Sequence, residues 1–265
     1  MDDSAVSAES VLVRREGAIV TVTLNRPDKF NALNLPAWRR LAEVMGELGA
    51  DMSVRCIVLR GAGDKAFAAG ADISEFSNER ANSAQAHAYD QIVNRATSGI
   101  VNCPHPIVAM IKGACVGGGL EVAAMCDFRI CGTSSRFGVP INRLGLTIAY
   151  PELRGMLALV GRAVTLEILL EGRIMGADEA YAKGLVTRVV PDDKVEEETY
   201  ATARRIADGA PLVNRWHKKF VGRLESGEKL TDADVKENYA CYDTEDFRTG
   251  VAAFLAKKKP EFKGR

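Results

Sequence analysis

Two glycine-rich loops, each placed directly after a short apolar run, restrict the fold of this chain more than any other feature. The first loop, residues 61–73, follows the apolar residues 56–59. The second, residues 112–127, follows residues 107–111. Short apolar runs of this kind are typical of strands buried on both faces of a sheet. Since glycine lets the backbone turn sharply and approach other groups closely, both segments predict a strand, a tight loop and a helix in succession.

A further strand and two helices are expected around these loops. Residues 18–24 alternate in polarity, which predicts a strand. Asn34 is the expected N-cap of a helix that continues to about Gly49, and residues 81–102 show a second helical periodicity. Strand and helix therefore alternate through the first half of the chain, as in an α/β protein.

The last part of the chain is expected to be helical. Strand signals stop at about residue 190, and amphipathic helices are predicted at residues 192–208, 213–224 and 243–258. No low-complexity segment or long Pro/Gly linker separates this part from the rest. We therefore expect an α/β core at residues 1–195 and a C-terminal helical region at residues 196–265 that packs against it.

Charge and cysteine content argue against several classes of partner. The chain carries 35 Lys and Arg against 35 Asp and Glu, so no overall field attracts nucleic acid or an anionic membrane. The longest apolar stretches end well before the roughly 20 residues that a membrane span needs. Six cysteines without CxxC spacing indicate reduced thiols, neither a disulfide framework nor a zinc site. The acidic N-terminus shows no targeting signal. We expect a cytoplasmic protein without metal, nucleic-acid or membrane partners.

Each glycine-rich loop offers a backbone N–H group that can bind an anionic oxygen. Asp72 followed by Glu75 fits a capping box, which would place Ala71 just before a helix with its N–H free. In the second loop, three glycines at the start of a helix leave the N–H of Gly118 unpaired. Glu121 lies three residues later, on the same helical face. An oxyanion donor and a carboxylate would then flank one substrate carbon, as proton transfer beside a carbonyl requires.

Other nucleotide-binding and catalytic motifs are missing from the sequence. There is no Gly-Lys-Ser/Thr of a phosphate loop, and the glycines at 117–119 do not extend into GxGxxG. No GxSxG motif is present, and no motif surrounds His87, His105 or His217. We interpret the three histidines as structural or surface residues.

Several ordered motifs together identify a family. They are Asn25-Arg26-Pro27, Asn31-Ala32-Leu33, and residues 66–73, 117–121 and 252–262. In this order they resemble the crotonase (enoyl-CoA hydratase/isomerase) superfamily over nearly the whole chain. The resemblance implies an α/β spiral of ββα units with a C-terminal helical region that mediates trimerisation, commonly as a dimer of trimers. It also implies an acyl-CoA-processing enzyme that stabilises a thioester enolate, with no cofactor beyond the coenzyme A of its substrate.

The resemblance assigns site residues one by one. The N–H groups of Ala71 and Gly118 take the oxyanion-hole positions, and Glu121 takes the position of a catalytic glutamate. The acyl-CoA is expected along residues 29–33 and 69–73, and Lys65 either meets a phosphate or stays solvated. The residues implied in binding coenzyme A are Lys29, Ala32, Leu33, Ala69, Asp72, Ile73 and Gly117, with Phe262 and Lys263 supplied by a neighbouring subunit.

The sequence departs from the family at its second catalytic carboxylate. Typical hydratases carry a second glutamate after the proline of the next motif, and here Pro140 is followed by Ile141. With Glu121 alone, hydration, double-bond isomerisation and decarboxylation of a malonyl-type thioester are alternatives. An enoyl-CoA hydratase/isomerase is the leading expectation. Local resemblance to methylmalonyl-CoA decarboxylase, at residues 140–142 and 242–247, makes decarboxylation the alternative. A noncatalytic CoA-binding or RNA-binding scaffold is a further alternative, which the balanced charge disfavours.

Three residues near the altered motif are candidates for the pocket: Arg143, Tyr150 and Glu152. The tyrosine of that decarboxylase falls on Ile148 by ungapped counting, and Tyr150 lies two residues away. Whether Tyr150 or Glu152 enters the pocket stays open, as does a role for Arg143 in binding a substrate carboxylate. We interpret all three as structural or surface residues. The identity of the acyl chain is not defined by the sequence.

Overall fold

Two β-sheets form the centre of the molecule, which a computed structural model describes for residues 9–265. The strands of the larger sheet are β1 (Val11–Glu16), β2 (Ile19–Leu24), β3 (Cys56–Gly61), β5 (Ile107–Ile111), β7 (Phe128–Gly132) and β10 (Arg188–Val190). Those of the smaller sheet are β4 (Ala66–Ala68), β6 (Ala114–Val116), β8 (Arg136–Gly138) and β9 (Met175–Gly176). The spatial orders are β1-β2-β3-β5-β7-β10 and β4-β6-β8-β9.

Three consecutive strand pairs connect the two sheets. In the larger sheet β1 and β2 form an antiparallel hairpin, whereas β2, β3, β5, β7 and β10 run parallel. After β3, β5 and β7 the chain enters the smaller sheet as β4, β6 and β8, which are parallel to one another. A helix follows each of these short strands before the chain returns to the larger sheet. This repetition confirms the expected spiral of ββα units.

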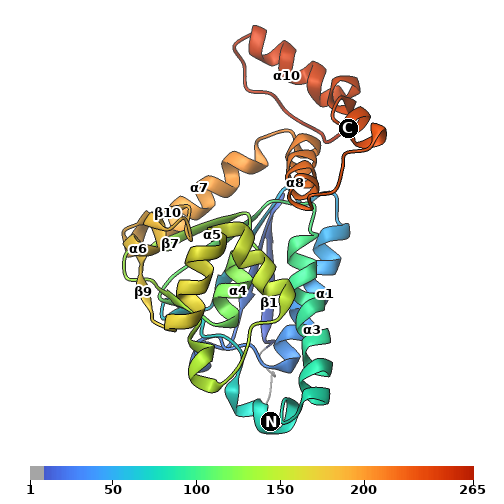
Figure 1. The fold of residues 1–265 in the computed structure, drawn as a ribbon. Coiled ribbons are helices and arrows are strands. Elements are labelled where there is room, and N and C mark those ends of the chain that lie inside the picture. The colour runs from blue at the N-terminus through green and yellow to red at the C-terminus, as the bar shows by residue number, and fades with distance from the viewer. Residues whose placement is uncertain (1–8) are drawn as a thin grey trace, which may run out of the picture.

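Helices cover the sheets on both sides. The helices up to the end of the last strand are α1 (Leu35–Ala50), α2 (Phe76–Glu79), α3 (Ser83–Val101), α4 (Gly118–Ala124), α5 (Tyr150–Glu171) and α6 (Ala177–Ala182). Short 3-10 turns lie at η1 (Pro27–Lys29), η2 (Ile73–Glu75), η3 (Pro140–Leu144), η4 (Asp192–Lys194) and η5 (Ala240–Asp243). The C-terminal helices are α7 (Val195–Ala207), α8 (Pro211–Glu225), α9 (Asp232–Glu237) and α10 (Glu245–Leu255). Figure 1 shows α1 and α3 side by side and α5 crossing in front of α4.

The larger sheet is buried on both faces because its central strands are apolar throughout. In β3, Ile57 and Leu59 belong to the main hydrophobic core, whereas Cys56 and Val58 pack in a second cluster that includes Val195 of α7. Successive side chains of a strand point to opposite faces, so an uninterrupted apolar run fills both clusters. The strands predicted at residues 56–59 and 107–111 are thereby confirmed.

The predicted helix starts are also largely confirmed. The Asn34 side chain accepts a hydrogen bond of 3.1 Å from the Ala37 N–H, and α1 begins at the next residue, Leu35. The helix predicted at 81–102 is α3. The predicted capping box of Asp72 and Glu75 is wrong. Asp72 accepts from the Ser74 N–H, whereas the Glu75 carboxylate accepts from the Leu35 N–H at 2.9 Å and so connects this loop to α1.

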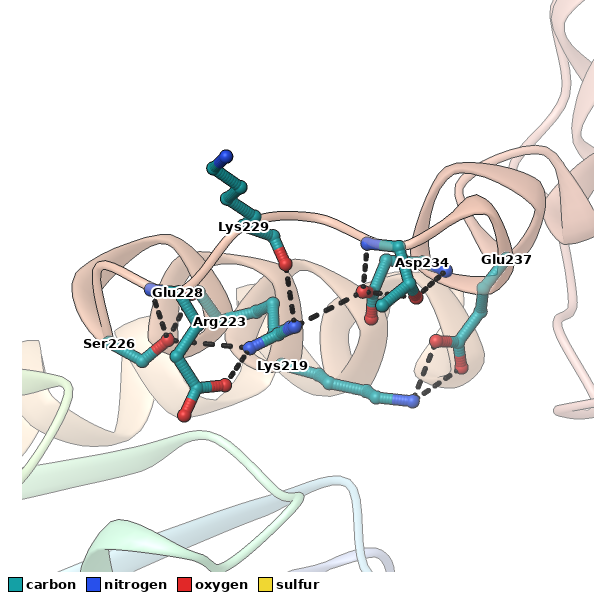
Figure 2. Close-up of polar contacts among 8 residues, drawn as sticks. Lys219, Arg223, Ser226, Glu228, Lys229, Asp234 and Glu237 are labelled. Atoms are coloured by element: carbon teal, nitrogen blue, oxygen red, sulfur yellow. Dashed lines mark hydrogen bonds and ion pairs between the residues drawn. The ribbon is translucent and has the colours of Figure 1, made fainter.

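Helices α8, α9 and α10 form a C-terminal arm, in which charged side chains join α8 to α9. Figure 2 shows Arg223 of α8 bound to the Asp234 carboxylate at 3.3 Å and to the Lys229 carbonyl at 3.0 Å. Lys219 of α8 also contacts Glu237, with 2.6 Å between Nζ and Oε2. These contacts fix the short helix α9 against α8. Beyond it, α10 stands away from the rest of the chain (Figure 1). Within residues 9–265, no helix is both long and apolar enough to cross a membrane.

Candidate active site

The two glycine-rich loops meet backbone to backbone. Gly70 has a φ of +100°, and a Cβ at this position would lie 3.1 Å from the Val116 carbonyl oxygen and 3.2 Å from the Gly118 nitrogen. Gly117, which precedes α4, has a φ of +54°. A side chain at either position would strain the backbone, and one at Gly70 would also crowd the second loop. Glycine is therefore required for the close approach that the sequence predicted.

Ala71 and Gly118 lie at this junction and have N–H groups without a protein partner. Leu33 pairs with the first loop on either side of Ala71, since its N–H donates to the Gly70 carbonyl at 2.8 Å and its carbonyl accepts from the Asp72 N–H at 3.0 Å. The Ala71 N–H therefore faces away from Leu33. Across residues 9–265, neither the Ala71 nor the Gly118 N–H donates to a protein acceptor. Ala71 N lies 3.5 Å from the Cβ position of Gly118, so two free donors are adjacent, as an oxyanion hole requires.

Asn31 holds the first loop in place. It is 2 % exposed, and its side-chain amide donates to the carbonyls of Ala62 at 3.0 Å and Ala66 at 2.7 Å. Its carbonyl oxygen accepts from the Arg26 N–H at 3.1 Å. The motifs around residues 25–33 thus have a structural role, because they fix the loop that carries Ala71.

A pocket of about 140 Å³ opens beside the two free donors. Its walls include Ile73, Phe76, Val93 and Ile148, which are apolar. Ile141 also lines the pocket, so the position where typical hydratases carry their second glutamate does face the pocket but bears no carboxyl group. An apolar pocket with a few convergent polar groups is the usual form of a small-molecule site.

Glu121 enters this pocket from the first turn of α4. Its half-buried side chain lines the pocket with the backbone of Gly118, as the three-residue spacing predicted. Removal from water and, second, the nearby Glu152 carboxylate raise the pKa of Glu121 from 4.5 to about 8. Arg80 acts in the opposite direction, and Asp90 adds a small increase. A carboxyl group in such surroundings keeps its proton at neutral pH and can act as an acid.

Glu152 is a second carboxylate in the same pocket. It lies in the first turn of α5, is 3 % exposed and lines the pocket together with Glu121. Glu152, whose entry into the pocket the sequence left open, therefore lies in the pocket wall and not on the surface. Tyr150, by contrast, is 88 % exposed, and Arg143 is exposed on η3; neither lines the pocket.

Four further polar side chains in the pocket wall were not predicted as site residues: Trp38, Arg80, Tyr89 and Asp90. Arg80 lies between the rings of Phe76 and Tyr89, at 4.9 and 5.0 Å from their centroids, and it pairs with Asp90 at 3.2 Å. Trp38 Nε1, Tyr89 Oη and Arg80 Nε are buried without a hydrogen-bond partner among the described residues. In the sequence these residues stand in ordinary helical patterns, so no motif identified them.

Comparison with known proteins assigns the fold and the site to one family. A sequence profile of the enoyl-CoA hydratase/isomerase family matches residues 14–265. The chain belongs to this family. It is therefore an acyl-CoA-processing enzyme of the hydratase/isomerase group, and the resemblance found in its motifs is confirmed.

Relatives match along almost the full length. A short-chain-enoyl-CoA hydratase of Clostridium acetobutylicum is 32% identical over 97% of this chain and 98% of its own. A probable enoyl-CoA hydratase of Rhizobium meliloti is 36% identical over 98% of this chain and 100% of its own. The crystal structure of an enoyl-CoA hydratase/carnithine racemase from Magnetospirillum magneticum superimposes with a TM-score of 0.96 at 54% identity, covering 98% of this chain and 97% of the other.

The residues that the family resemblance assigned to coenzyme A lie in three different places. Ala69, Ile73 and Gly117 line the pocket. Lys29, Ala32, Leu33 and Asp72 lie on the segments next to it, where Asp72 pairs with Arg26 at 2.9 Å. Phe262 and Lys263 lie in the C-terminal tail and are not part of this pocket in a single chain. The predicted role of Phe262 and Lys263 concerns a neighbouring subunit and stays a prediction.

The histidines and metal-binding side chains do not contribute to the site. His105 is fully buried, and burial lowers its pKa to about 4, whereas His87 and His217 are exposed. Within residues 9–265, no three His, Cys, Asp or Glu side chains converge as a metal site would require. The chemistry available to this pocket is that of two backbone N–H groups, the carboxyl groups of Glu121 and Glu152, and the ion pair of Arg80 with Asp90.

Proposed function

We propose that this enzyme adds water across the double bond of an enoyl-CoA thioester. The N–H groups of Ala71 and Gly118 would bind the thioester oxygen, and Glu121 would transfer the proton at the adjacent α-carbon. The observation that carries this proposal is the placement of two free backbone donors and a carboxyl group with a raised pKa in one pocket.

The charges in the pocket fit an enolate intermediate. When a nucleophile attacks the β-carbon, the electrons of the double bond move to the thioester oxygen. Two backbone N–H groups aimed at that oxygen stabilise the new negative charge and need no reorganisation during the reaction. Glu121, protonated because its pKa is about 8, then supplies the proton that the α-carbon takes up. The reverse reaction uses the same groups in the opposite order.

Double-bond isomerisation would use the same enolate and is the second candidate. It needs proton transfer at two carbons, and the pocket holds two carboxyl groups that are not ion-paired within residues 9–265, Glu121 and Glu152. Decarboxylation of a malonyl-type thioester has less support, because Tyr150 and Arg143 lie outside the pocket. The scaffold alternatives, with or without RNA, have no supporting feature in this pocket.

We propose that coenzyme A binds along residues 29–33 and 69–73 as part of the substrate, and that no separate cofactor takes part. The support is the pairing of Leu33 with Ala71, which places both segments at the edge of the pocket. Phe262 and Lys263 would complete the site from a neighbouring subunit of a homotrimer or a dimer of trimers. A cytoplasmic location is also proposed, which the six unpaired cysteines favour.

A screen of CoA thioesters by mass spectrometry tests the reaction. Wild-type protein should convert an enoyl-CoA to a product heavier by one water, and Glu121→Gln should lower the rate by a factor of about 10²–10⁴. Glu171→Gln makes the same chemical change at the exposed far end of α5 and should have no effect. Loss of CO₂ from a malonyl-type thioester, with no hydration of any enoyl-CoA, would contradict the proposal.

A further inference from the structure

Glu152 has an unused carboxylate oxygen in the wall of the active-site pocket. The Thr97 hydroxyl donates to its Oε1 at 3.3 Å, but Oε2 is buried and has no hydrogen-bond partner among residues 9–265. The side chain as a whole is only 3 % exposed. An unpaired buried acceptor is costly in folding, more so for a charged group. A carboxyl group with only a structural role would be expected to have partners for both oxygens.

The groups around Glu152 leave its charge largely uncompensated. The ionisable side chains facing it come from three elements: Asp90 on α3, Glu121 on α4 and Arg80 after α2. Arg80 is the one cation among them, and its guanidinium is already paired with Asp90 at 3.2 Å. Glu152 therefore has no dedicated counter-ion in the described part of the chain. Oε2 is thus left without a partner from the protein itself, in a residue that lines the pocket.

We propose that Glu152 is the second catalytic carboxylate of the water-addition reaction, acting from α5 where the usual position, Ile141, carries none. This inference rests on the hydration proposed above. Oε2 of Glu152 accepts a hydrogen bond from the water that attacks the substrate, and Glu121 serves the α-carbon. The two tasks of hydration are thereby divided between carboxyl groups on two different helices.

The proton transfers balance over one turnover. Glu152 takes a proton from water as the oxygen of that water bonds to the β-carbon, and the double-bond electrons move to the thioester oxygen held by Ala71 and Gly118. The enolate then collapses, and its α-carbon takes the proton of Glu121. The enzyme is left with Glu152 protonated and Glu121 ionised. Transfer of one proton from Glu152 to Glu121 through water restores the starting state.

The acidities of the two groups agree with this division. Burial raises the pKa of both carboxyl groups, and for Glu121 the charge of Glu152 is the second cause of a pKa of about 8. Two titratable groups whose surroundings push their pKa values apart are the usual form of an acid and base pair. With its pKa at about 8, Glu121 is the protonated acid near neutral pH, and the charge that helps to keep it protonated is that of ionised Glu152.

The test compares Glu152→Gln with Glu121→Gln in two reactions. The first is hydration of an enoyl-CoA. The second is exchange of the α-protons of a saturated acyl-CoA with D₂O, which is monitored by NMR. This exchange needs Glu121 and the oxyanion hole but no attacking water. Glu152→Gln should slow hydration by about a hundredfold or more and preserve exchange, whereas Glu121→Gln should abolish both. Glu171→Gln on the same helix is the control.

Each other result has a defined meaning. Hydration by Glu152→Gln within about threefold of wild type would overturn the assignment of Glu152 and leave the proposed function intact. Loss of both reactions together with a lowered melting temperature would overturn it in favour of a structural role; Glu152→Asp, which keeps the charge, should then fail in the same way. Wild-type protein that exchanges α-protons but hydrates no enoyl-CoA would overturn the proposed function itself, and the role of Glu152 with it.

Discussion

At the scale of single residues, the pocket places ionisable groups where the protein interior usually places apolar ones. Glu121 is removed from water, and the carboxylate of Glu152 lies near enough to raise its pKa. Both effects disfavour the ionised form of Glu121. The carboxyl group is nevertheless present, although Ile141 shows that an apolar side chain also fits this wall. A site that lowers the stability of the folded chain in this way indicates a function for the carboxyl group.

The free energy of unfolding should therefore depend on Glu121 in a pH-dependent way. Its pKa is raised from 4.5 to about 8 on folding, so its contribution to stability is fully present below pH 4.5 and is lost as the pH rises through about 8. Glu121→Gln removes this loss and should stabilise the protein by on the order of 3 kcal/mol at pH 8. Urea denaturation at pH 4.5 and pH 8.5 measures the difference, which should nearly vanish at the lower pH.

The rate of hydration should fall as the pH rises past about 8. Glu121 must be protonated to supply the α-proton, and the groups that face it and set its pKa are Glu152, Arg80 and Asp90. In Glu152→Gln the repulsion from one carboxylate is absent, so the alkaline limb of the residual activity should move to lower pH. A pH profile of kcat for both proteins tests this. An unchanged limb would show that Glu152 does not act on Glu121.

Residues of the site could be predicted from the sequence only where a local motif marks them. Glycines before Ala71 and Gly118 and the three-residue spacing to Glu121 were such marks, and these three residues do meet at one pocket. Glu152 and Arg80 reach the same pocket through the packing of α5 and the α2–α3 connection. Which face of a helix is turned to a pocket depends on tertiary contacts, and the sequence near Glu152 contains no such information.

At the scale of elements, the contact of α4 with β4 determines where the N-terminus of α4 lies. A Cβ at Gly119 would lie 2.2 Å from the Ala68 carbonyl oxygen, so α4 can reach this position only because residue 119 has no side chain. The contact sets the position of Gly118, one residue earlier, relative to the first loop. Helix α4 is thus placed by a steric requirement as well as by apolar burial.

Substitution of Gly119 tests this placement. Gly119→Ala should destabilise the protein by roughly 2–3 kcal/mol, because the added methyl group overlaps backbone that cannot move away. It should also lower activity by displacing the Gly118 N–H. Gly46→Ala is the matched control, since Gly46 is exposed in α1 with nothing within 4 Å of its Cβ position. That change should stabilise by about 0.5–1 kcal/mol through helix propensity. Equal effects of both substitutions in thermal unfolding would contradict the proposed role of the contact.

Elements with a clear periodicity were predictable, and the shortest were not. The strands β3 and β5 and the helices α1 and α3 lie within a few residues of their predicted bounds. The second sheet was missed, because its strands have only two or three residues each and no alternation can be recognised over that length. The second sheet follows from the repeated ββα connection. The family resemblance implied this connection, whereas local sequence patterns did not predict it.

At the scale of the whole molecule, the C-terminal arm has a firm internal structure and an exposed apolar surface. Asp246, 2 % exposed, accepts hydrogen bonds from the N–H groups of Lys263 at 2.7 Å and Gly264 at 2.8 Å, so the tail folds back along the start of α10. On the same helix, Phe254 is 83 % and Leu255 75 % exposed. Large apolar side chains gathered on a projecting element are typical of a surface that another chain covers.

The arm should therefore control the state of assembly. A homotrimer or a dimer of trimers is proposed, and burial of Phe254 would contribute to its stability through about 25 cal/mol for each Å² of apolar surface removed from water. Phe254→Glu places a charge on that surface and should shift the protein toward monomer at micromolar concentration, as measured by size-exclusion chromatography with light scattering. Phe254→Leu keeps the surface apolar and should remain assembled.

Because Phe262 and Lys263 are expected to act on a neighbouring subunit, the dissociated variant should also show a raised KM for the acyl-CoA. Wild-type protein that is monomeric under these conditions would contradict the assembly, and an undisturbed oligomer of Phe254→Glu would show that this face of α10 lies outside the interface.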